Sequence, residues 1–263
     1  MRVLALDTTT RAGSVAVLDG HATLVERAGD EARGHAERLP GEALDALAAC
    51  GLRVEDVDLF AVASGPGSFT GLRIGIATIQ GLAFVRQRPV EAVSALEALG
   101  YVGARLPRDP AGAARPDREG LLVAAVMDAR RHEVFSALYE AAPSESPDAP
   151  RLLELEAPSV GAPAAALDRW SRWLADRDVL FIGDGAELYA EVLQGTASRS
   201  VRVAGAPLLA AAIARMAAGR LAAGTGSGPA AVQPLYVRRP DAELARDAAR
   251  AGAAAAPRAG GTG

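Results

Sequence analysis

A short polar run, Asp7-Thr8-Thr9-Thr10, lies between two apolar segments at 3–6 and 14–18. A turn that gathers hydroxyls and backbone N–H groups at one point is a natural cradle for phosphate, and an aspartate beside it suits a magnesium ion. Aspartate and threonine are also ordinary turn residues. The run alone therefore leaves a phosphate cradle and a plain turn both open.

A second candidate is the glycine-rich segment 64–75, with the sequence SGPGSFTGLRIG. It follows a predicted buried strand at 57–63 and begins a predicted helix at 70–86, and the N-terminus of a helix favours anions. It is not a Walker loop, because no Gly-Lys pair follows, and the spacing of Gly65, Gly67 and Gly71 differs from the dinucleotide fingerprint. The sequence contains no lysine at all, which excludes Schiff-base and kinase lysines.

Glycines inside the predicted helix need a reason, because each costs about 1 kcal/mol relative to alanine. Helical spacing places Gly71, Gly75 and Thr78 on one face, and Ala77 and Gly81 on another. Such flat faces fit close packing inside the chain. They equally fit a subunit interface that an exposed Phe69 would reach, and both explanations stay open.

The predicted elements around these motifs form two similar groups. Each group starts with a three-stranded β-meander and continues with helices, which predicts an α/β architecture of two lobes with a shorter second lobe. The meanders are expected at 3–6, 14–18 and 22–27, and at 121–127, 132–139 and 151–156. Further helices are expected at 35–50, 94–101, 163–174, 186–194 and 207–221, and further strands at 89–93 and 179–182. The predicted domain ranges are 1–103 for the first lobe, 104–119 for a linker, 120–240 for the second lobe and 241–263 for a flexible tail.

Composition narrows the functional classes. A net charge of −4 gives no overall positive field that would attract nucleic acid. The only cysteine, Cys50, excludes an internal disulfide and suits a reducing cytosol. No apolar run reaches the length of a membrane helix, so we expect a cytoplasmic protein without a membrane anchor.

The two motifs, continued as DTTTRAGSVAV and SGPGSFTGLRIGIATIQGLAF, resemble the TsaB family. The resemblance extends to HAERLP from His35, to DAR from Asp128, to Glu133-Val and to YVR from Tyr236, over roughly residues 1–240. It implies the two-lobed actin-like ATPase fold of the actin, sugar kinase and Hsp70 superfamily, with a reduced second lobe. It also implies a paralogue of the enzyme TsaD.

Departures from the enzymatic members of that superfamily imply a site without catalysis. Ala95 and Leu99 stand where TsaD carries a metal-binding His-x-x-x-His, so no metal is expected. The strand that should lead into a glycine phosphate loop ends in Asp128-Ala-Arg-Arg, and the adenosine loop survives only as Gly183-Asp-Gly. The resemblance therefore implies a relic nucleotide site made of Asp7, Thr8, Thr9 and Asp128. No cofactor is expected, and any weak ATP or ADP binding is expected only at this half-site or at an interface in a complex.

Members of the family act as partner subunits. The resemblance implies that this chain binds TsaD, helps to recruit the ATPase TsaE and forms a homodimer when alone, within the complex that makes N6-threonylcarbamoyladenosine (t6A) in ANN-decoding tRNAs. It implies contact with tRNA mainly through that complex. The expected partner interface consists of His35, Leu39, Phe69, Gly71, Arg73, Gly75 and Thr78.

Two alternatives remain beside this interpretation. A rival class is an enzyme, either a small-molecule kinase of the same fold or a glycoprotease-type peptidase. The arginines Arg130, Arg131, Arg238 and Arg239 form either a small basic patch or, more simply, solvated surface.

Overall fold

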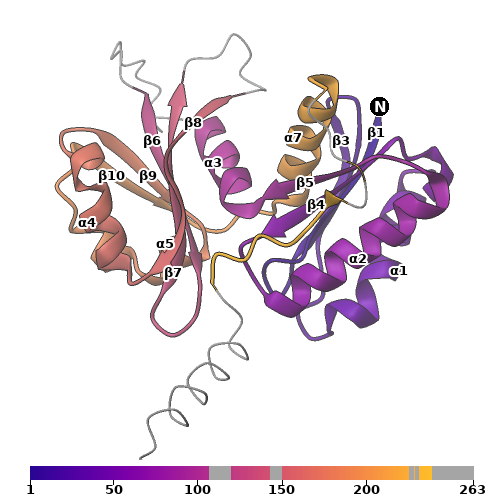
Figure 1. Cartoon of the computed structure of the whole chain (residues 1–263), viewed down its shortest axis with the longest axis horizontal. Helices are drawn as coiled ribbons and strands as arrows, with labels where there is room; N and C mark the ends of the chain where they lie inside the picture. The colour runs from indigo at the N-terminus through magenta and orange to yellow at the C-terminus, as the bar shows by residue number, and fades with distance from the viewer. Residues whose placement is uncertain (107–119, 143–149, 225–227, 229–230, 239–263) are drawn as a thin grey trace, which may run out of the picture.

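The computed structural model describes residues 1–106, 120–142, 150–224, 228 and 231–238. Two lobes lie side by side, and each contains a five-stranded mixed sheet with helices packed on its faces (Figure 1). Of the predicted linker at 104–119, residues 104 and 105 instead belong to a helix that ends at Arg105, and residues 107–119 lie outside the described part of the chain, as does the predicted tail at 241–263. None of the helices in the described part of the chain is both long and apolar enough to cross a membrane.

The first lobe begins with the predicted meander of β1 (Arg2–Asp7), β2 (Ser14–Asp19) and β3 (Ala22–Ala28), which pair antiparallel. Two parallel strands, β4 (Leu59–Gly65) and β5 (Val90–Ser94), complete the order β3-β2-β1-β4-β5. Helices α1 (His35–Ala49) and α2 (Phe69–Arg86) cover one face, and a short 3-10 helix, η1 (Val54–Asp56), precedes β4. Because successive side chains of a strand point to opposite faces, Leu4 and Leu6 pack toward α1 and α2, while Val3 and Ala5 enter a separate core.

The second lobe repeats this topology. Its meander consists of β6 (Leu121–Asp128), β7 (Val134–Ala142) and β8 (Arg151–Gly161), and β9 (Asp178–Ile182) and β10 (Ser200–Ala204) extend it in parallel, in the order β8-β7-β6-β9-β10. The sequence did not predict β10. Its helices are α4 (Pro163–Leu174, 12 residues), α5 (Asp184–Leu188) and α6 (Ala190–Gln194), and the last two replace the single helix expected at 186–194. Compared with the 15 and 18 residues of α1 and α2, these helices make the second lobe the reduced one.

Two helices, α3 (Ala95–Arg105) and α7 (Ala210–Ala222), join the lobes through one apolar core. This core takes Val3 and Leu59 from the first sheet, Val123 and Leu180 from the second, and Ile213 from α7. Figure 1 shows α3 in the middle of the molecule, between the two sheets. Each lobe also has a core of its own on its outer face.

The position of α7 corrects the predicted domain range. The range 120–240 assigned this helix to the second lobe, but it packs on β1, β2 and β4 of the first sheet. The first lobe also caps it, since the Ser14 hydroxyl accepts from the backbone N–H groups of Leu209 and Ala210 at 3.3 and 3.1 Å. A carboxylate oxygen of Glu26 accepts from the N–H of Ala211 at 2.8 Å. These bonds satisfy backbone groups that the helix itself leaves unpaired.

Candidate functional site

The turn after β1 folds around Asp7. One carboxylate oxygen of Asp7 accepts from the backbone N–H of Thr9 at 2.9 Å and from its hydroxyl at 2.7 Å. Burial raises the pKa of Asp7 above its usual value, the two hydrogen bonds from Thr9 oppose that shift, and the nearby Asp184 adds to it. Gly13 allows the turn to close, because it has a φ of +60° and a Cβ there would lie 2.3 Å from the Asp7 carbonyl oxygen.

A cavity of about 1150 Å³ separates the lobes at this turn. Three of the four residues predicted for the relic nucleotide site, Asp7, Thr9 and Asp128, line it. Thr8 does not line it and is instead fully buried against α2. The cavity also receives Asp184, a carboxylate that the sequence reasoning did not single out, although it lies in the predicted Gly183-Asp-Gly remnant.

The loop between β6 and β7 forms the second-lobe wall of the cavity. Arg130, Arg131 and His132 have φ of 61°, 57° and 60°, a left-handed turn that costs roughly 1–2 kcal/mol per non-glycine residue. Its start is held by Asp128, which accepts from the N–H of Arg130 at 2.8 Å and pairs with its guanidinium at 3.1 Å. A long charged side chain therefore stands where a glycine loop would admit a phosphate.

Asp184 ties the two remnant loops of the second lobe together. One of its carboxylate oxygens accepts from the backbone N–H groups of Asp128 and Gly185, at 3.0 and 2.9 Å. Gly185 lies so close to β6 that a Cβ would stand 2.7 Å from the carbonyl carbon of Met127. The Asp184 carboxylate is thus engaged in holding the two loops together.

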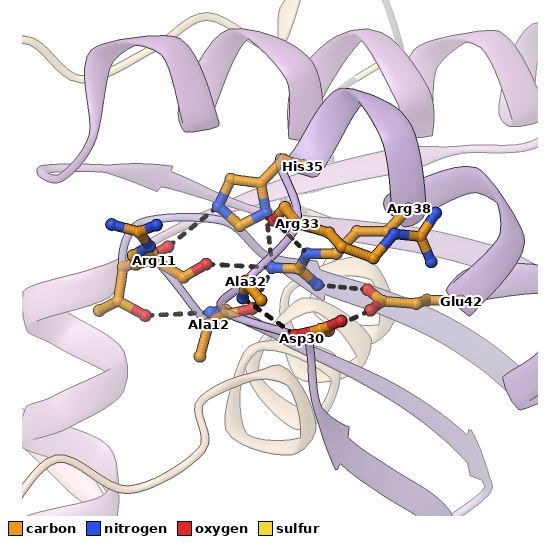
Figure 2. Close-up of polar contacts among 10 residues, drawn as sticks. Arg11, Ala12, Asp30, Ala32, Arg33, His35, Arg38 and Glu42 are labelled. Carbon is orange, nitrogen blue, oxygen red and sulfur yellow. Dashed lines mark hydrogen bonds and ion pairs between the residues drawn. The ribbon is translucent and has the colours of Figure 1, made fainter.

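His35, one of the predicted interface residues, connects α1 to the turn after β1 (Figure 2). Its Nε2 lies 3.0 Å from the carbonyl oxygen of Thr10, and its Nδ1 lies 3.0 Å from Nη2 of Arg38. Because a guanidinium has no acceptor, Nδ1 accepts and Nε2 carries the hydrogen. His35 therefore makes polar contacts at the start of α1 that hold this helix to the turn after β1.

Arg38 is the centre of the same network (Figure 2) and is only 3% exposed. It donates to the carbonyl oxygens of Arg11 and Ala12 at 3.0 and 2.5 Å, and it pairs with Glu42 at 2.5 Å. The N-cap residue of α1 is Gly34, which supplies no side-chain cap. Arg38 thus holds the loops that flank the beginning of α1, a role that sequence reasoning missed.

The glycines of α2 settle one of the open alternatives. A Cβ on Gly71 would lie 2.3 Å from the carbonyl oxygen of Thr8, and one on Gly75 would lie 2.3 Å from the Thr8 hydroxyl. Both glycines therefore serve close packing inside the chain. On the other face, a Cβ on Gly81 would meet none of the described atoms within 4 Å.

The remaining predicted interface residues divide between core and surface. Leu39 is 1% exposed in the first-lobe core, so Leu39, Gly71 and Gly75 were wrongly predicted as contact residues. The Thr78 hydroxyl donates to the carbonyl oxygen of Ile74 at 2.8 Å and is half-buried. Phe69 and Arg73 are exposed and contact each other, with the Arg73 guanidinium 4.0 Å from the centre of the Phe69 ring.

The most exposed large apolar side chains in the described residues are Phe84 (79%) and Val85 (76%), near the end of α2. Sequence reasoning missed them, although they follow Gly81 at helical spacing on the face that carries Ala77. Leu44 (48% exposed) adds a further apolar side chain from the neighbouring α1. We call Leu44, Ala77, Gly81, Phe84 and Val85 the α1–α2 surface.

Metal ligands are not assembled in the described residues, where no group of three or more His, Cys, Asp and Glu side chains could hold an ion. Ala95 and Leu99 are buried in the shared core. Of the four arginines that left a basic patch open, Arg238 pairs with Glu133 and Arg130 with Asp128, so carboxylates offset two of the charges. Arg239 lies outside the described residues.

Two lobes of equal topology around a cavity that meets the ends of β1 and β6 define an α/β protein of the actin-like ATPase fold, with a reduced second lobe. The family model described as TsaD, tRNA N6-adenosine threonylcarbamoyltransferase, matches residues 29–249. The chain belongs to this family and, within it, to the TsaB, or YeaZ-type, members, as the relatives below indicate.

An uncharacterized protein of Mycobacterium tuberculosis is 32% identical over 92% of this chain and 93% of its own. The TsaB proteins of Bacillus subtilis and Escherichia coli are 29% and 37% identical, over 74% and 53% of this chain and 76% and 55% of theirs. The match to a Mycobacterium leprae protein, 39% identical over 52% of this chain, spans 35% of that protein. A crystal structure of a Pseudomonas aeruginosa protein with similarity to peptidase YeaZ superposes with a TM-score of 0.71 and 32% identity, over 90% of this chain and 99% of that one.

Proposed function

We propose that this protein takes part in the biosynthesis of t6A in tRNA, as a non-catalytic subunit that binds and orders TsaD. Relatives that match this chain carry the name tRNA threonylcarbamoyladenosine biosynthesis protein TsaB. That shared name supports the pathway. The partner role rests on the surface and on the cavity of this chain.

The observation that carries the partner role is the α1–α2 surface. Phe84 and Val85 are 79% and 76% exposed, and fully burying such side chains contributes about 1.5–3 kcal/mol each. Gly81 and Ala77 lie on the same face, so a partner helix can approach the backbone of α2 closely. An exposed apolar face of this kind is typical of an interaction site.

The cavity supports a role without catalysis. A kinase of this fold needs a loop that admits a phosphate and a general-base carboxylate that faces the substrate. Here Arg130 occupies the loop, and its guanidinium pairs with Asp128. Asp184 is engaged by two backbone N–H groups, and Asp7 by Thr9. The rival classes, a small-molecule kinase and a glycoprotease-type peptidase, therefore have less support.

In the proposed complex, which we place in the cytoplasm, TsaD carries out the transfer and this chain stabilises the active arrangement of TsaD. The chain also helps to recruit TsaE, and tRNA is held mainly by the assembled complex. A second copy of the chain competes for the same α1–α2 surface. An excess of TsaD should then convert homodimers into heterodimers.

Binding to TsaD tests the surface directly. Phe84→Asp places a charge on the most exposed apolar side chain of the α1–α2 surface and should weaken the affinity for TsaD at least roughly 30-fold, as expected for an interface residue that carries much of the binding energy. Leu188→Asp is the matched control, because Leu188 is 60% exposed on α5 of the other lobe. Isothermal titration measures both affinities, and circular dichroism checks folding. A folded Phe84→Asp variant that binds TsaD like the wild type would refute this interface.

Depletion in the cell tests the pathway. Removing the protein should remove t6A from tRNA, as measured by mass spectrometry of digested tRNA. Wild type and Leu188→Asp should restore the modification, whereas Phe84→Asp should not. Unchanged t6A after depletion would refute the pathway itself, separately from the interface.

A further inference from the structure

Residues 231–238 cross from the first lobe to the second near the end of the described chain (Figure 1). On the first lobe, the side chain of Val232 enters the core under α1 and α2, and its carbonyl oxygen accepts from Gln80 at 3.3 Å. The backbone N–H of Leu235 then donates to the carbonyl oxygen of Ser64 at 2.7 Å, at the end of β4. Gly65 permits this contact, because a Cβ there would lie 3.0 Å from the Leu235 carbonyl oxygen.

The next residue adds an aromatic contact on the first lobe. The ring of Tyr236 lies 5.1 Å from that of Phe69, and its hydroxyl accepts from Nε of Arg73 at 3.0 Å. Two residues that the sequence predicted for a partner interface are thus engaged by the chain itself.

Arg238 makes the contacts on the second lobe. Its guanidinium donates to the carbonyl oxygen of Ala129 at 2.7 Å, pairs with the carboxylate of Glu133 and lies 5.6 Å from the centre of the Phe135 ring. Ala129 and Glu133 bracket the left-handed turn of the β6–β7 loop. Within seven residues, the segment therefore binds the loop ends of β4 and of β6, one in each lobe.

The same segment forms part of the cavity between the lobes, where Leu235, Tyr236 and Arg238 stand in its wall. Asp7 and Asp128 reach this cavity from the two lobes. A change in the angle between the lobes would alter the distance between these walls. It would also pull the segment away from one of its two attachments.

We propose that residues 231–238 form a latch that fixes the angle between the lobes and limits the opening of the cavity, and that the contact of Arg238 with Glu133 is its release point. The core around α3 and α7 joins the lobes independently of the contact between Arg238 and Glu133. Loss of that contact should therefore change the angle between the lobes and leave the fold intact. If the segment merely packs against the two lobes, loss of this contact would loosen the segment and leave the angle between the lobes unchanged. The inference does not depend on the proposed function.

A charge swap tests the release point. Arg238→Glu and Glu133→Arg each put like charges together, and both should raise hydrogen exchange roughly tenfold or more in peptides that cover 129–134 and 232–238. The double variant Arg238→Glu/Glu133→Arg should restore the ion pair and bring exchange part of the way back to the slow rate of the wild type, because a glutamate cannot donate to the carbonyl oxygen of Ala129. Peptides from β1 report global folding and should not change. Arg130→Gln is the matched control, because it removes a positive charge from the same loop and leaves the contacts of Arg238 in place.

Distance measurements separate a latch from loose packing. With Cys50 replaced by serine, spin labels at Asp45→Cys on α1 and Glu191→Cys on α6 report the separation of the lobes by double electron–electron resonance spectroscopy. The single charge reversals should broaden or shift this distance distribution, and the double variant should move it back toward that of the wild type. Faster exchange of the segment with an unchanged lobe separation would overturn the latch, as would single reversals that change neither measurement.

Discussion

Replacing Gly75 by alanine is the sharpest test of the packing between α2 and the turn after β1. The new methyl group would lie 2.3 Å from the Thr8 hydroxyl and 3.1 Å from its methyl carbon, and both distances are shorter than van der Waals contact. Thr8 is fully buried, so it has little room to move. Its hydroxyl also lacks a hydrogen-bond partner among the described residues, so its displacement forfeits no hydrogen bond.

Two effects of opposite sign set the magnitude. Alanine favours the helix over glycine by about 1 kcal/mol, whereas overpacking a filled core typically costs about 1–3 kcal/mol. Since the overlap is severe, we expect a net loss of about 1–2 kcal/mol, which lowers the melting temperature by roughly 2–8 °C. The space beside Gly81 on the same helix is open, so Gly81→Ala gains the helix preference of alanine without any overpacking. This variant should raise the melting temperature by roughly 1–4 °C.

Thermal unfolding of four proteins completes the assay: wild type, Gly75→Ala, Thr8→Ala and the double variant. Removing the Thr8 side chain beyond Cβ makes room for the new methyl group, so the double variant should be more stable than the sum of the single effects, by about 0.5–3 kcal/mol. Additive effects, or a Gly75→Ala variant as stable as Gly81→Ala, would refute the packing. The bulkier Gly75→Leu should unfold the protein, so a loss of partner binding in this variant would not locate an interface.

Other expected outcomes concern the cavity. Because burial raises the pKa of Asp7 above its usual 3.8, the folded state holds that proton more tightly, and stability falls as the pH rises through the folded pKa. Asp7→Asn should therefore melt at a higher temperature than the wild type at pH 7, with the difference shrinking toward pH 3; a variant less stable at pH 7 would contradict the reasoning. The isolated chain should release phosphate from ATP at far below about 1 per second and carry no stoichiometric zinc or iron, as measured by phosphate release and metal analysis. Either activity or metal would reopen the enzyme class.

Local patterns in the sequence predicted most elements of the fold. Alternating and continuous apolar runs gave both meanders, and a helical stripe that includes Leu39 and Leu47 gave α1. The strand β10 was missed because it is short, half-exposed and contains Arg202. Periodicity also found α7 but not its position, because nothing local in the helix encodes its long-range caps, Ser14 and Glu26.

The candidate site was only partly predictable. The ends of β1 and β6 meet at one cavity because equivalent strands of two like lobes face each other, so Asp7 and Asp128, which the family resemblance grouped, both line it. Helical spacing showed that Gly71 and Gly75 share a face, but it does not reveal which neighbour that face contacts. The contacts of Arg238 depend on chain segments 105 and 109 residues away, beyond the reach of any local pattern.

The return of α7 to the first sheet has a consequence for synthesis on the ribosome. The inner face of that sheet, with Val3, Ala5 and Leu18, is covered by a helix whose cap bonds span 195 and 196 residues. Chain growth delivers roughly 5–20 residues per second, so this apolar face waits on the order of ten seconds or more for its cover. The first lobe, made first, is therefore completed last, and the nascent chain needs protection from aggregation during that interval.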